Sequence, residues 1–223
     1  MTIESVNTDP NITRIYIVRH GQTDHNVKKI LQGHIDTSMN TTGLIQAEKL
    51  GEFFKNLPID YFLSSDLIRC KQTLNEILKN QDYDESSIRY TSNLREREMG
   101  PVQNMLLKDA LEKYGPNFRN FGEKEEQLCS RVETEFNKLL DSDYKNVIFC
   151  THGGVITRFC NYLHSDLGFE LNNGLTPNDL RVPFNTSITV VDYGKSAKKG
   201  VIQSFGGTDH LGGKFEVKDQ LLR

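Results

Sequence analysis

The stretch "RIYIVRHGQTDHN", Arg14 to Asn26, begins as a buried strand and then changes character. Its first residues form a short apolar, largely β-branched run, which is typical of a strand covered on both faces in a parallel sheet. Arg19 and His20 follow without a polar spacer, and Gly21 ends the strand pattern. The sequence therefore places a guanidinium and an imidazole where a buried strand reaches the end of the sheet.

Short apolar runs alternate with helical periods along the rest of the chain. The pattern predicts further strands over 59–66, 88–94, 146–150, 186–193 and 200–205, and helices over 41–57, 67–80, 123–142 and 153–165. Such alternation implies βαβ units in an α/β fold with a mostly parallel sheet. The last two strands are predicted to pair antiparallel across the turn "GKSAKK", at the edge of the sheet.

Three local expectations accompany this fold. We expect residues 1–13 to be a flexible tail before a single domain over 14–223, and residues 99–122 to be irregular. The first long helix is predicted to bury one face, formed by Leu44, Ala47, Leu50, Phe54 and Leu57.

Composition narrows the class of protein. The chain has 223 residues, a formal net charge of -3 and a pI near 6.1, so no basic excess favours nucleic acid as a partner. No apolar run approaches the ~20 residues that a membrane span needs. The N-terminus lacks a secretory pattern. The four cysteines are interpreted as reduced, small apolar residues, and the expected location is cytoplasmic.

Polar residues follow three of the predicted strands. The first ends at Arg19-His20-Gly21, another leads into a helix that carries Arg69, and a third ends at Thr151-His152-Gly153-Gly154. In a parallel sheet, ligands bind beyond the carboxyl ends of the strands. The two arginines could hold one phosphoryl group through forked hydrogen bonds. A histidine between them should resist protonation and could then attack phosphorus.

The segments "RHGQTDHN", "SSDLIRCKQT", "LREREMG" and "THGG" together resemble the ordered motifs of the histidine phosphatase superfamily, the phosphoglycerate mutase-like branch. The resemblance spans residues 14–192. It implies a three-layer α/β/α sandwich and an enzyme that forms a phosphohistidine at His20, with Glu96 as proton donor and no metal or cofactor. Arg19, Arg69 and His152 would complete the catalytic set. The implied substrate-binding residues are Gln22, Thr23, Asn26, Gln32, Gly33 and Gly153.

Three functions fit these motifs. A phosphatase of small phosphorylated metabolites, such as sugar phosphates or bisphosphates, is favoured, because the segment after the acid motif is short and lacks the Arg-His-Tyr-Gly run of the cofactor-dependent mutases. A phosphoglycerate mutase and a catalytically silent interaction module are the alternatives. Many phosphatase members carry Glu-Gly where this chain has Gln103 and Asn104, which leaves the loop geometry there open.

Several charged residues have more than one reading. Glu98 lies two residues from Glu96, so spacing alone does not exclude it as the proton donor. Some side chains could meet a second anion of the substrate, although each is more often a surface charge: Arg97, Lys108, Arg119 and Lys124. The remaining histidines and the Asn-x-Ser/Thr triplet at Asn185 receive no functional role. A monomer and a homodimer are both compatible with the sequence.

Overall fold

The computed structural model describes residues 6–218, which form a seven-stranded sheet with helices on both faces. The order of the strands across the sheet is β3-β2-β4-β1-β6-β7-β5. Their bounds are β1 Ile12–Arg19, β2 Tyr61–Ser65, β3 Ile88–Thr91, β4 Asn146–Thr151, β5 Glu170–Leu171, β6 Ile188–Gly194 and β7 Lys199–Gly207. Within these pairings only β6 runs against its neighbours. The antiparallel pairing is therefore correct, but the reversed strand lies inside the sheet and not at its edge.

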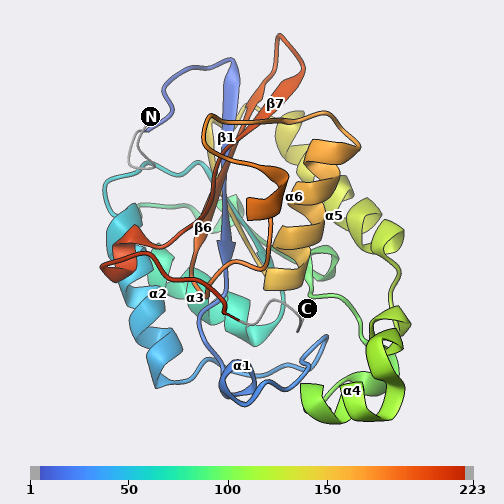
Figure 1. The fold of residues 1–223 in the computed structure, drawn as a ribbon. Helices are drawn as coiled ribbons and strands as arrows, with labels where there is room; N and C mark the ends of the chain where they lie inside the picture. The colour runs from blue at the N-terminus through green and yellow to red at the C-terminus, as the bar shows by residue number, and fades with distance from the viewer. Residues whose placement is uncertain (1–5, 219–223) are drawn as a thin grey trace.

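Helices cover the two faces of the sheet as separate layers (Figure 1). Their bounds are α1 Asp24–Lys28, α2 Thr41–Phe54, α3 Ile68–Leu78, α4 Leu107–Tyr114, α5 Glu125–Leu140 and α6 Gly153–Ser165. Helices α2 and α3 pack on one face, and α5 and α6 pack on the other. The predicted three-layer α/β/α sandwich is confirmed.

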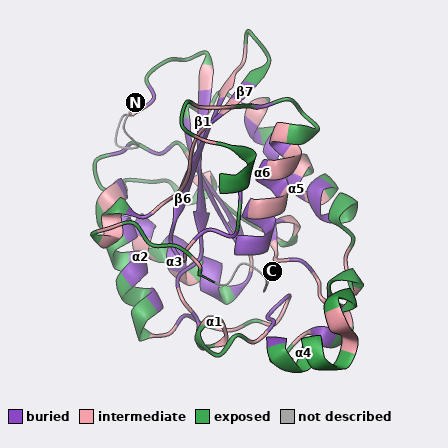
Figure 2. Cartoon of the chain, in the orientation of Figure 1, coloured by how far each residue is buried: buried purple, intermediate pink, exposed green. Residues whose placement is uncertain are grey.

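Strand β1 contains a continuous apolar run in the sequence because both of its faces are buried. Successive side chains of a strand point to opposite faces. Ile15 and Ile17 join the core beneath α5 and α6, whereas Tyr16 and Val18 join the core beneath α2 and α3. All four are at most 1% exposed, and β1 is buried over most of its length in Figure 2. This double burial gives the sheet two cores and fixes the strand ends where the polar residues stand.

The prediction that Leu44 belongs to the buried face of the helix over 41–57 is wrong. Leu44 is 38% exposed, while Gly43 is buried at the start of α2. A Cβ at Gly43 would collide with the backbone carbonyl of Gln22. The helix thus approaches the loop after β1 through its glycine, and this contact turns Leu44 outward.

The predicted flexible tail also needs correction. Residues 1–5 lie outside the described part, but β1 already begins at Ile12. Asn7 is 7% exposed, and its side-chain amide donates to the carbonyls of Ile12 and Lys145 at 2.7 and 3.1 Å. These bonds tie the segment before β1 to the start of β4.

Residues 99–122, here called the cap, are not irregular as predicted, because they contain helix α4. The helix has eight residues, and its N-cap, Leu106, provides no capping side chain, so the usual start signal is missing from the sequence. The cap builds a small apolar cluster of its own with Leu31, separate from the two cores of the sheet. Its buried members are Leu31, Val102, Leu107, Ala110 and Phe118.

Candidate active site

The register of β1 and β4 brings the two predicted histidines together. The strands are parallel neighbours with Arg19 opposite Thr151, and the backbone N–H of His20 donates to the Thr151 carbonyl at 3.0 Å. His20 and His152 are the next residues of each strand, and their ring centroids lie 5.2 Å apart. The predicted convergence at the carboxyl end of the sheet is present.

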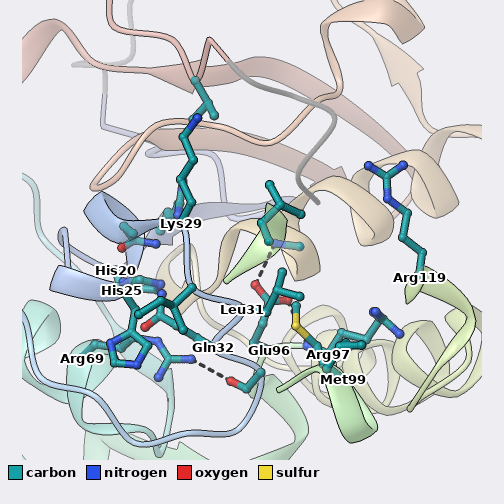
Figure 3. Close-up of a pocket in the computed structure, with 18 of the residues that line it drawn as sticks. His20, His25, Lys29, Leu31, Gln32, Arg69, Glu96, Arg97, Met99 and Arg119 are labelled. Carbon is teal, nitrogen blue, oxygen red and sulfur yellow. Dashed lines mark hydrogen bonds between the residues drawn. The ribbon is translucent and has the colours of Figure 1, made fainter. Parts of the chain in front are cut away.

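The ring of His20 has a defined tautomer. Its Nδ1 lies 2.7 Å from the carbonyl oxygen of Gly21, which can only accept a hydrogen bond, so Nδ1 carries the proton in the neutral ring. The lone pair is then on Nε2. His20 is 3% exposed and lines a cavity of about 390 Å³ (Figure 3). The ring therefore has a nucleophilic nitrogen and a ligand space beside it.

Arg69, in the first turn of α3, is fully buried and held from three sides. Its Nε donates to His152 Nδ1 at 3.3 Å, and its two terminal nitrogens donate to the carbonyls of Ile35 and Gly33 at 2.8 and 3.0 Å. A guanidinium has five N–H donors. Two of them thus remain for an anion in the cavity that Arg69 lines.

His152 holds the guanidinium of Arg69 in place and is itself held by Ser65. Because its Nδ1 accepts from Arg69, its Nε2 carries the proton and donates to Ser65 Oγ at 2.9 Å. Burial first, and then the charge of Arg69 and the proximity of His20, hold the pKa of His152 well below its usual value. His152 is not among the described residues that line the cavity. Its effect on a ligand would therefore pass through Arg69, which it holds by a hydrogen bond.

Arg19 completes the cationic end of the cavity. It is 1% exposed, and its Nη1 donates to the carbonyl of Pro183 at 2.6 Å. It lines the same cavity as His20 and Arg69.

Glu96 approaches the cavity from the loop that follows β3. Its carboxylate accepts the backbone N–H of Arg97 at 2.9 Å and that of Gly154 at 3.0 Å. Burial raises the pKa of Glu96, but these two bonds and the charges of Arg158 and Arg69 outweigh burial and leave the pKa lowered. The site without ligand therefore holds Glu96 as a carboxylate at neutral pH.

Glu98, the rival acid, faces the cap. Its carboxylate accepts the N–H of Gly100 at 2.6 Å, and the described lining of the cavity does not include it. Geometry therefore places Glu96, and not Glu98, in the lining of the cavity that His20 also lines.

The other residues expected to bind substrate divide into two groups. Asn26, Gln32 and Gly33 line the cavity, whereas Gln22, Thr23 and Gly153 do not appear in its described lining. Thr23 caps α1, Gln22 accepts a hydrogen bond from Asn40, and Gly153 begins α6.

The cationic candidates for a second anion divide in the same way. Arg97 and Arg119 line the cavity, and Lys108 and Lys124 are absent from its described lining. Arg97 already donates to the carbonyls of Phe121 and Glu123 at 2.6 and 3.2 Å. Arg119 is exposed and lies at the far side of the site from Arg69 in Figure 3.

The sequence did not predict several residues of the site, and Arg158 and Asn185 are two of them. Arg158 lies one helical turn after Gly154, donates to its carbonyl at 3.2 Å and lines the cavity; this i+4 spacing was a usable signal. Asn185 is 5% exposed, and its amide donates to the carbonyl of His20 at 3.0 Å and to Asn26 Oδ1 at 3.3 Å. No local pattern could connect Asn185 to a residue so distant in the chain.

Gln103 and Asn104, where the chain departs from many phosphatase members, each have a defined place in the loop. Asn104 has a φ of 69°, a left-handed conformation that asparagine tolerates better than most residues and that glycine adopts freely. Gln103 Oε1 accepts the backbone N–H of His34 at 2.9 Å, as a carboxylate could.

Gly154→Ala should impair catalysis without unfolding the chain. The added Cβ would collide with Glu96 Oε1, whereas alanine suits a helix better than glycine. We expect kcat to fall about 10- to 100-fold, because small misplacements of a catalytic group are costly, with the far-UV circular dichroism unchanged. A normal kcat in this variant would contradict the assigned position of Glu96.

The free energy of unfolding should fall as the pH falls from 7 to 5. Burial holds the pKa of His152 well down and lowers the pKa of His210 to about 4. Below the ordinary histidine pKa of about 6.5, the unfolded state binds protons that the folded state excludes, which costs up to about 1.4 kcal/mol per pH unit for each histidine. Urea titrations at pH 7.5 and 5.5 measure the loss, and His210→Gln should reduce it. Equal stabilities at the two pH values would contradict the neutral state of these rings.

Residues 6–218 contain neither a metal-binding cluster nor a membrane-spanning helix. No group of three or more histidine, cysteine, aspartate or glutamate side chains in residues 6–218 is arranged to hold a metal ion. None of the helices there is both long and apolar enough to cross a membrane.

Comparison with known proteins gives consistent matches. A model of the histidine phosphatase superfamily (branch 1) matches residues 15–203. Broad-specificity phosphatase YOR283W of Saccharomyces cerevisiae is 43% identical over 229 residues, covering 97% of this chain and 96% of that protein. Fructose-2,6-bisphosphatase TIGAR of Xenopus tropicalis is 36% identical over 132 residues, covering 55% of this chain and 48% of that protein. The solved structure of mycobacterial glucosyl-3-phosphoglycerate phosphatase Rv2419c shares the fold, with a TM-score of 0.72 at 21% identity over 88% of this chain and 99% of that one.

Proposed function

The chain belongs to the histidine phosphatase superfamily, and from that premise we propose that it is a phosphomonoesterase of small phosphorylated metabolites, acting through a phosphohistidine at His20. One observation carries the assignment of the nucleophile. The buried imidazole of His20, whose Nε2 carries the lone pair when the ring is neutral, lines one cavity together with two buried guanidinium groups, Arg19 and Arg69. This combination suits attack on an anionic phosphorus centre.

In the first step, His20 Nε2 attacks phosphorus while the bond between phosphorus and the ester oxygen breaks. Arg19 and Arg69 hold the equatorial oxygens, whose charge they neutralise in the transition state. The leaving oxygen takes a proton from Glu96. A bound phosphate adds negative charge beside this carboxyl, opposes the lowering of its pKa and so favours the protonated form that the step requires.

In the second step, water attacks the phosphohistidine and restores the free ring. Glu96, now a carboxylate, accepts a proton from the attacking water. The bond between Nε2 and phosphorus breaks, and inorganic phosphate leaves with the oxygen atom of that water. His152 remains neutral throughout, because its Nδ1 must accept from Arg69 to keep that guanidinium in place.

The class of substrate is supported by the relatives and by charge. YOR283W is named a broad-specificity phosphatase and TIGAR a fructose-2,6-bisphosphatase, so sugar phosphates and bisphosphates are the first compounds to examine. The described lining of the cavity includes seven lysines and arginines and one acidic side chain, Glu96, which suits an anionic ester. We also propose a cytoplasmic location, because all four cysteines are buried and unpaired.

A metabolite phosphatase screen tests this function. Purified protein is incubated with p-nitrophenyl phosphate, sugar phosphates, sugar bisphosphates and glycerate phosphates, and released phosphate is measured beside a His20→Ala control. Phosphate release that depends on His20 supports the proposal. No release from any compound, with no acid-labile phosphate on the protein, would overturn it.

A further inference from the structure

We propose that the cavity selects phosphate monoesters whose leaving group presents an apolar surface, such as an alkyl chain or an aryl ring; this inference rests on the proposed phosphatase function. The observation behind it is an apolar wall between the phosphoryl end of the cavity and the rim at Arg119. The wall consists of Leu31, Met99, Val102, Leu107 and Phe118. In Figure 3, Leu31 and Met99 lie between the group around His20 and Arg119.

The apolar wall is a fixed surface. Four of its members belong to the buried cluster of the cap, where each is at most 7% exposed, and Met99 packs against that cluster. Backbone hydrogen bonds join the two segments that carry the wall. The N–H of Leu31 donates to the carbonyl of Met105 at 3.0 Å, and the N–H of Leu107 donates to the carbonyl of Lys29 at 2.9 Å. A leaving group would therefore meet a preformed apolar face, which is the usual character of a ligand pocket.

The wall offers no partner to the hydroxyl groups of a sugar. Beside the wall, the amide side chains in the described lining are Asn26 and Gln32, and their oxygens are already engaged as acceptors, so that only their N–H groups could meet a hydroxyl. Asn26 Oδ1 accepts from Thr23 and Asn185, and Gln32 Oε1 accepts from the hydroxyls of Thr23 and Thr37 at 3.1 and 2.6 Å. Moving a sugar hydroxyl from water to such a wall costs free energy, because the hydroxyl loses its hydrogen bonds. Moving a methylene group there lowers the free energy of binding.

The test uses three esters of primary alcohols, so that the bond broken is chemically the same: ethyl phosphate, hexyl phosphate and glucose 6-phosphate. Each methylene fully removed from water strengthens binding by up to about fourfold. We expect kcat/KM for hexyl phosphate to exceed that for both ethyl phosphate and glucose 6-phosphate by at least about tenfold. Equal values for ethyl and hexyl phosphate, or a preference for glucose 6-phosphate, would overturn the inference while leaving the phosphatase function in place.

Two substitutions connect the preference to the wall. Met99→Gln and Val102→Thr keep the size of each side chain but add polar atoms, and each should lower the ratio of kcat/KM for hexyl over ethyl phosphate by about three- to tenfold. Met105→Gln is the matched control, because Met105 packs against the same cluster but is not among the described lining residues; it should leave the ratio unchanged. A ratio that falls equally in all three variants would assign the effect to cap stability and overturn the inference. If the protein hydrolysed neither the three esters nor p-nitrophenyl phosphate, the proposed function itself would be overturned.

Discussion

His20→Ala should reduce the hydrolysis of every substrate by about 10⁴-fold or more, because removal of a covalent nucleophile eliminates the two-step route. The wild-type protein, mixed rapidly with ³²P-labelled substrate and quenched in base, should carry a phosphoryl group that is stable to alkali and labile to acid. The variant should carry none. The measurement is a single-turnover experiment with both proteins at equal concentration.

A matched histidine provides the control for this substitution. His164 also uses its Nδ1 to bond a backbone carbonyl, that of Phe169 at 2.8 Å, but it lies at the other end of α6. His164→Asn should keep full activity and full phosphorylation. A His20→Ala protein that retains more than a few per cent of wild-type kcat would show that His20 is not the nucleophile.

Glu96→Gln should lower kcat for alkyl phosphates by about 10²- to 10⁴-fold, the usual contribution of a general acid and base. The loss in the first step should be much smaller with p-nitrophenyl phosphate, because its leaving group departs without a proton. The second step still lacks a base, so a burst of nitrophenol followed by a slow phase is expected. Stopped-flow absorbance measures both phases.

The pH profile and the second glutamate complete this test. For wild type, kcat should fall as the pH rises above the pKa of Glu96 in the complex with substrate, since the protonated acid is then lost; the Glu96→Gln variant should lack that limb. Glu98→Gln should change kcat less than about fivefold, because Glu98 accepts from Gly100 within the cap. If Glu98→Gln were instead the damaging change, the proton donor would have to be reassigned.

The sequence predicted the sheet and the cationic end of the site well, because their signals are local. An apolar run followed directly by Arg-His-Gly identifies the end of β1, and an apolar run followed by Thr-His-Gly identifies the end of β4. Parallel pairing then brings the two rings together without further information. The reversal of β6 was visible from its turn with β7, but its place beside β1 was not, because strand order depends on pairings between distant segments.

The remaining parts of the site depend on contacts that leave no local trace. Asn185 supports His20 from 165 residues away, and its triplet looked like chance. Leu44 was misplaced because periodicity does not reveal that Gly43 must touch the loop at Gln22. Helix α4 was missed because it is short and lacks a capping side chain, so its stability depends on packing in the apolar cluster of the cap.

The position of β6 has a consequence for biosynthesis. Strand β1 pairs with β4 on one side and with β6 on the other, and its partner residues in β6 are 188–194, which follow all the proposed catalytic residues in the chain. A ribosome has thus already released every proposed catalytic group before β1 can cover its second edge. Until then a long apolar strand edge is exposed to other nascent chains, which is a known route to aggregation. The addition of β6 to the sheet is therefore the step of folding that covers this edge of β1.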